Sequence, residues 1–62
     1  MATYFRFAVS SVSEVRQFLG AASYIVDVRP YHESFEIMVR DTALDRIYFL
    51  EVSASIAAEF DN

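Results

Sequence analysis

The stretch "RIYFLEVSASIAAEF", residues 46–60, decides the fold, because it is apolar both as a strand and as a helix. An extended strand would carry apolar side chains on both faces, and a helix would carry two separate apolar stripes. If the stretch is extended, the chain has the element order β-α-β-β-β. If residues 43–60 form one helix, the order becomes β-α-β-β-α.

The preceding segment, "SFEIMVRD" at residues 34–41, favours the extended interpretation. It alternates apolar and polar residues, which is typical of a half-buried strand. A four-residue loop at Thr42–Asp45 would place Asp41 opposite Arg46. This register aligns three apolar pairs on one face: Val39 with Tyr48, Ile37 with Leu50, and Phe35 with Val52. The alignment predicts a strand from Arg46 onward.

A helix over residues 43–60 is the alternative. Thr42 and Asp45 have capping-box spacing, and several alanines follow residue 53. Against the helix stand the strand-favouring isoleucine, tyrosine and phenylalanine after Arg46, and charges that would be scattered around the whole helical circumference. We favour the strand, with a short helical turn from Ser55 left open.

The rest of the chain predicts two more strands and one helix. "TYFRFAVS" at residues 3–10 and "YIVDVRP" at residues 24–30 alternate with period two, as half-buried strands do. "SVSEVRQFLG" at residues 11–20 places its apolar side chains on one helical face. Ser11 followed by Glu14 has the spacing of a capping box at the start of this helix.

Two local features set the ends of these elements. Gly20 is predicted either to end the helix in a left-handed cap or to let it run one turn further. The turn-forming residues Pro30–Glu33 predict a four-residue loop that places Arg29 opposite Ser34. This second register pairs Val28 with Phe35, Val26 with Ile37, and Tyr24 with Val39.

Together these predictions give an α+β fold, a single small domain over residues 1–62 with one helix packed on one face of a four-stranded mixed sheet. The side chains expected under the helix are Phe5, Phe7, Val26, Val28, Ile37, Val39, Leu50 and Val52. The same pairing predicts two rows on the opposite face, an apolar row of Ile25, Met38 and Phe49 and an acidic row of Asp27, Glu36 and Glu51. Tyr4 joins this face from the first strand.

We predict that this opposite face binds protein, with the apolar row as anchor and the acidic row as a charged border. One use is a homodimer formed by back-to-back sheets. Another is capture of a basic partner, whose arginines or lysines would meet the acidic row. The simpler alternative is that Arg6, Arg29 or Arg40 reaches over and neutralises the row, leaving an ordinary salt-bridged exterior.

Composition narrows the class of protein. A chain of 62 residues is close to the lower limit of independent stability, and without cysteine it has no disulfides, so self-association is the expected support. Five arginines face nine carboxylates, and the net charge of −4 opposes binding to a phosphate backbone. We therefore expect no direct nucleic-acid binding, and we expect the acidic chain to approach a basic protein.

No motif names a reaction. His32, Glu33 and Ser34 are neighbours in a predicted turn, where adjacent residues seldom point at one another as a catalytic relay requires. Gly20 is the only glycine, which excludes the dinucleotide fingerprint and the phosphate-binding loop. A flat sheet presents carboxylates poorly to a divalent metal. We expect no enzyme, no catalytic residues, no metal and no cofactor.

The chain shows no signal-peptide pattern, and its longest aliphatic or aromatic run, Ile47–Leu50, is too short to span a membrane. We expect a cytoplasmic protein. In general type, tiny, acidic and free of cysteine, it resembles phage and mobile-element inhibitors such as anti-CRISPR proteins, although no motif carries that resemblance. The expected function is therefore inhibition of a basic nucleic-acid-handling protein. The alternatives are a structural or regulatory subunit whose sheet self-assembles, and a small-ligand-binding regulatory domain.

Overall fold

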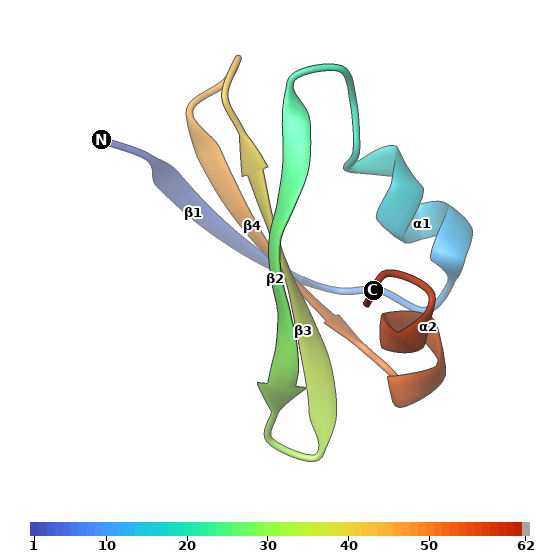
Figure 1. Ribbon diagram of the computed structural model, residues 1–62. Coiled ribbons are helices and arrows are strands. Elements are labelled where there is room, and N and C mark those ends of the chain that lie inside the picture. The colour runs from blue at the N-terminus through green and yellow to red at the C-terminus, as the bar shows by residue number, and fades with distance from the viewer. Residues whose placement is uncertain (62) are drawn as a thin grey trace.

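A computed structural model describes residues 1–61, which form a four-stranded mixed sheet and two short helices (Figure 1). The elements in chain order are β1 (Thr3–Ala8), α1 (Val12–Gln17), β2 (Ser23–Tyr31), β3 (Ser34–Asp41), β4 (Arg46–Val52) and α2 (Ala54–Ala58). The predicted α+β fold class and the β-α-β-β-β order are confirmed. The short helical turn that the sequence left open at Ser55 is α2, which follows β4.

The first half of the deciding stretch, Arg46–Val52, forms strand β4 in the centre of the sheet. The strand order is β1-β4-β3-β2, with β1 parallel to β4 and the other two pairings antiparallel. In the β3–β4 ladder Asp41 lies opposite Arg46, Ile37 opposite Leu50, and the remaining predicted pairs align in the same register. The alternative of one helix over residues 43–60 is wrong, because extended pairing lets β4 bury apolar side chains against both neighbouring strands.

The hydrophobic core lies between the sheet and the two helices, which cover the same face (Figure 1). Ile37 and Leu50 are the largest of the fully buried apolar side chains, and Val15 of α1 packs with them. The complete buried set is Val9, Val15, Ile37, Val39, Tyr48, Leu50, Val52 and Ala57. Burial of a side chain as large as leucine stabilises a fold by about 1.5–3 kcal/mol, so this small set carries much of the folding free energy.

The helix α1 begins as the sequence predicts and ends differently. The side chain of Ser11 accepts a hydrogen bond from the backbone N–H of Glu14 at 3.2 Å, which is the predicted N-cap. The helix ends at Gln17, and its C-cap Phe18 has a right-handed helical conformation, so both alternatives predicted for Gly20 are wrong. Gly20 has no positive φ and lies in the connection to β2.

The β2–β3 hairpin is tighter than predicted. Tyr31 pairs with Ser34, which leaves a two-residue turn at His32 and Glu33 in place of the predicted four-residue loop. The predicted pairing of Arg29 with Ser34 is therefore wrong by two residues. Pro30 continues the strand, which an edge strand allows because its missing N–H can face away from the ladder.

A β-bulge at Val26 changes which side chains of β2 face the helices. The register shifts between Ile25 and Asp27, so Ile25 lies opposite Val39 and packs against the core. Val26, predicted to lie in the core, is 48% exposed. The extra residue reverses the alternation before it, and the predicted position of Ile25 on the opposite face is wrong.

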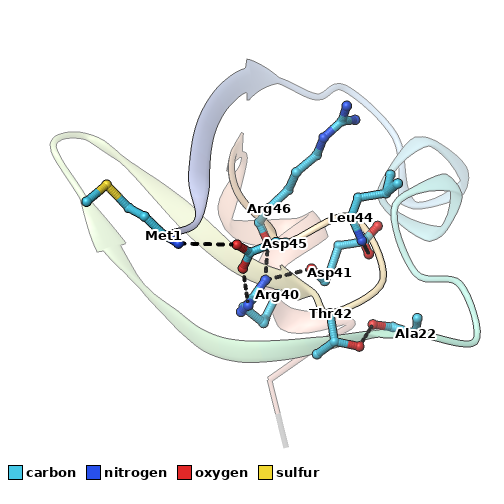
Figure 2. Close-up of polar contacts among 8 residues, drawn as sticks. All are labelled: Met1, Ala22, Arg40, Asp41, Thr42, Leu44, Asp45 and Arg46. Atoms are coloured by element: carbon cyan, nitrogen blue, oxygen red, sulfur yellow. Dashed lines mark hydrogen bonds and ion pairs between the residues drawn. The ribbon is translucent and has the colours of Figure 1, made fainter.

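The β3–β4 turn is the predicted loop Thr42–Asp45, and Arg40 holds it together (Figure 2). Arg40 Nη1 donates to the backbone oxygens of Asp41 at 2.6 Å and Arg46 at 3.1 Å. Its Nη2 donates to Oδ1 of Asp45 at 2.6 Å, and this hydrogen bond keeps the pKa of Asp45 below its ordinary value. The turn is thereby ordered by an arginine that comes from the preceding strand.

The backbone conformation of His32 predicts that glycine would be more stable than alanine at this position. His32 has φ of 54°, a left-handed conformation that penalises residues with a Cβ and that glycine adopts freely. We expect His32→Gly to raise the free energy of unfolding by about 0.5–1 kcal/mol relative to His32→Ala, measured by urea denaturation. A glycine variant no more stable than the alanine variant would contradict this explanation of the turn.

Candidate protein-binding face of the sheet

The candidate site is the sheet face opposite the helices, called here the outer face. Two rows cross its centre. The first runs from Asp27 through Met38 and Phe49 to Arg6, and the second runs from Arg29 through Glu36 and Glu51 to Ala8. The predicted pairs Met38 with Phe49 and Glu36 with Glu51 are confirmed.

The two predicted rows are nevertheless mixed. Asp27 lies opposite Met38, so it belongs to the apolar row, and Arg29 takes the place that was predicted for Asp27. Ile25 belongs to the core side. The outer face therefore does not carry an uninterrupted acidic row beside an uninterrupted apolar one, and each carboxylate lies close to an arginine.

Glu36 is the centre of this face and is only 1% exposed. Its Oε1 accepts hydrogen bonds from Arg29, with Nε at 3.0 Å and Nη2 at 2.9 Å. Its Oε2 lies 2.8 Å from Nη1 of Arg6, a close charge contact without a well-aligned hydrogen bond. Two arginines from the two edge strands, β1 and β2, thus meet on one carboxylate of β3.

The two arginines determine the charge state of Glu36. Burial alone would raise the pKa of this carboxyl, because a charge loses hydration when it leaves water. The contacts from Arg6 and Arg29 outweigh that cost and hold the pKa of Glu36 below its ordinary value. The carboxylate is therefore charged at neutral pH, and its charge is already compensated within the chain.

Aromatic rings surround the guanidinium of Arg6. Its carbon lies 4.4 Å from the ring centroid of Tyr31 and 5.1 Å from that of Phe49, distances typical of cation–π contacts. Arg6 also lies 3.6 Å from Oε2 of Glu51, which is a weaker ion pair. Tyr4 packs against Phe49 with ring centroids 5.9 Å apart and is itself 66% exposed. These side chains cover the centre of the outer face, and Tyr4 lies at its edge.

Six of the seven predicted site residues lie on the outer face, and Ile25 does not. Glu36 is buried under two arginines, whereas Tyr4 and Asp27 are exposed and Met38 is half-buried. The structure adds Arg6, Arg29 and Tyr31 to this cluster. From the sequence, Arg6 and Arg29 were among the arginines that could neutralise the acidic row. Tyr31 was missed because it was placed in a turn.

In the described part of the chain, only four of the nine carboxylates are paired with an arginine. Asp27, Glu36, Asp45 and Glu51 each have an arginine within ion-pair distance. Within residues 1–61 the other carboxylates form no ion pair, and they are Glu14, Glu33, Asp41, Glu59 and Asp61. These five carboxylates lie on α1, in the β2–β3 turn, at the end of β3 and after α2, away from the centre of the outer face.

The described part of the chain contains no pocket and no group of three or more potential metal ligands. None of its helices has the length and apolar character needed to cross a membrane. Comparison of the chain with protein-family models, with curated proteins and with solved structures finds no match.

Proposed function

We propose that this chain is a non-catalytic protein-interaction module that binds and inhibits a basic protein, such as a component of a nucleic-acid-handling complex in the cytoplasm. One observation carries the proposal. Arg6, Arg29 and Arg40 each pair with carboxylates of the chain itself, while five other carboxylates have no arginine within ion-pair distance among residues 1–61. These five carboxylates lie away from the centre of the outer face, on a chain whose net charge is −4, so a cationic surface can approach them.

This proposal differs from the one based on the sequence in where the partner binds. Glu36 cannot be a leading contact, because its charge is buried and compensated. Glu33 in the β2–β3 turn and Glu59 and Asp61 after α2 are exposed. Exposed charges of one sign accelerate association with an oppositely charged partner and make the affinity depend on salt. Tyr4 remains the best-exposed apolar contact among the predicted site residues.

Charge reversal tests the proposal. We expect proteins captured from a host extract by the immobilised chain to be basic, and to be lost when Glu33→Lys, Glu59→Lys and Asp61→Lys are combined. The control combines Glu33→Asp and Glu59→Asp, which keep the charge and should keep the captured proteins. Binding of the identified partner, measured with purified components, should weaken as salt is raised. Equal capture by the lysine variant would remove electrostatic attraction from the explanation.

The self-assembling subunit is the second candidate, and a specific feature favours it. The edge strand β1 is exposed along five of its six residues, and no element of the described chain pairs with its outer side. An unpaired strand edge is a template for another strand.

A further inference from the structure

The sheet has two edges, and only one of them is protected against pairing. On β2 the bulge at Val26, the proline at residue 30 and the exposed charges of Asp27 and Arg29 all hinder a further strand. The strand β1 contains no proline, glycine or bulge, and its only charged residue is Arg6. The open edge of the molecule is therefore β1.

The backbone groups that β1 offers can be assigned from its pairing with β4. The N–H of Thr3 donates to the oxygen of Asp45 at 3.1 Å, and the N–H of Val9 donates to the oxygen of Glu51 at 2.9 Å. Because the hydrogen-bonding groups alternate sides along a strand, the odd-numbered residues of β1 face β4. The N–H and C=O groups of its even-numbered residues, Tyr4, Arg6 and Ala8, point away from the sheet.

The charge of Arg6 is directed away from this edge. Its guanidinium extends across β4 to Glu36 on β3, where Nη1 lies 2.8 Å from Oε2. Two strand spacings separate β1 from β3, about 10 Å. A charged side chain is a common means of blocking an edge. Here the ion pair with Glu36 takes that charge off the edge and leaves the backbone accessible.

Apolar surface lies beside the open backbone on the helix-covered side. The rings of Phe5 and Phe7 are stacked with centroids 6.3 Å apart, and Phe7 is 41% exposed although it contacts Phe18, the C-cap residue of α1. A strand added to β1 would cover these rings. Aromatic pairs across neighbouring strands contribute roughly 0.2–1 kcal/mol each beyond alanine, in addition to the area that they bury.

We propose that β1 pairs antiparallel with β1 of a second copy of this chain, about a twofold axis at Arg6, and joins the two sheets edge to edge. In this register Tyr4 of each copy lies opposite Ala8 of the other, and Arg6 lies opposite Arg6. All the outward backbone groups of β1 are then paired. Phe5 of each copy meets Phe7 of the other, so the two exposed aromatic clusters cover one another. Symmetry makes this contact self-complementary.

Charge argues against the basic partner proposed above at this edge, and the symmetric register, with Phe5 and Phe7 on either side of Arg6, favours a second copy. The only charge on β1 is positive, so a cationic partner gains nothing at this edge. Two copies with a net charge of −4 each repel one another over most of their surfaces, and β1 carries no carboxylate. The predicted back-to-back dimer is less favourable, because Glu36, Arg6 and Arg29 would have to be covered at its centre. The inference does not depend on the proposed inhibition of a basic protein.

Removal of one outward N–H tests the pairing. Proline at residue 8 has no N–H to donate, while the pairing of β1 with β4 does not use that group. We expect the natural chain to show twice its monomer mass of 7.1 kDa by light scattering at high concentration. Ala8→Pro should remain folded by circular dichroism and be monomeric. The control Ala8→Val, which keeps the N–H and favours strands, should stay dimeric.

Amide hydrogen exchange tests the pairing in the natural chain, without a substitution. In the dimer the amides of Tyr4, Arg6 and Ala8 should be protected, and their protection should fall on dilution while that of Phe5 and Phe7 is retained. If Ala8→Pro unfolds, a synthetic chain with an N-methylated amide at Ala8 replaces it, with the same expected loss of the dimer. A natural chain that is monomeric at every concentration, or a dimer in which these three amides exchange freely, would overturn the proposal. So would a monomer that binds only extended segments of other proteins.

Discussion

Leu50→Ala is expected to remove a large part of the free energy of unfolding of the chain at 25 °C. Leu50 is fully buried in the middle of β4, between β1 and β3 and beneath the helices. Truncation of a buried leucine to alanine costs about 2–5 kcal/mol, since transfer free energy is lost and a cavity remains. A domain of this length has a total stability of only about 3–9 kcal/mol at the usual value per residue. Urea denaturation followed by circular dichroism measures the difference.

Leu44→Ala is the matched control, because it makes the same chemical change at a side chain that is 57% exposed in the β3–β4 turn. We expect its free energy of unfolding to stay within about 0.5 kcal/mol of the natural chain. Equal losses from the two substitutions would contradict the position of β4 in the centre of the sheet.

The second large effect is expected at Glu36. In Glu36→Gln the charge is lost and a buried amide group is placed against two guanidinium groups, from Arg6 and Arg29. An unsatisfied buried polar group costs about 1–3 kcal/mol, and we expect a loss of stability in that range at pH 7. Asp27→Asn is the control, because Asp27 is exposed and its contact with Arg29 is long, at 3.8 Å. A change within about 0.5 kcal/mol is expected there.

The same carboxylate predicts a dependence of stability on acid. The folded chain holds the pKa of Glu36 below its ordinary value, so the unfolded chain takes up the proton first as the pH falls. Its contribution is fully present above the unfolded pKa, about 4.3, and is lost as the pH falls through the folded pKa. Urea denaturation between neutral pH and pH 3 should show this loss in the natural chain and a smaller one in Glu36→Gln. Parallel curves would assign the acid sensitivity to other carboxylates.

Much of the fold could be predicted from the pairing of β3 with β4. Two alternating segments joined by a short loop admit few registers, and only one aligned Ile37 with Leu50 on a common face. The same reasoning failed on β2 for two local reasons. A bulge at Val26 adds a residue without altering the visible alternation, and Pro30 suggests a turn even where an edge strand tolerates it.

The candidate site was harder to predict than the fold. Alternation placed Arg6, Glu36 and Glu51 on one face, but it did not give the strand order. That order places β1 beside β4, from where Arg6 reaches Glu36 across a single strand. A row of carboxylates that looked available for a partner is thereby compensated within the chain. Which arginine meets which carboxylate depends on tertiary pairing, about which the local sequence carries no information.

The titration of Glu36 tests this compensation most directly. Carbon-13 NMR of the labelled side-chain carboxyl, followed from neutral pH into acid, reports the protonation of this one residue in the folded chain. A midpoint below the ordinary glutamate value is expected, because Arg6 and Arg29 stabilise the charged form. A midpoint at or above that value would contradict the contacts of Glu36 with Arg6 and Arg29. Glu36 would then be a carboxylate that a basic partner could bind.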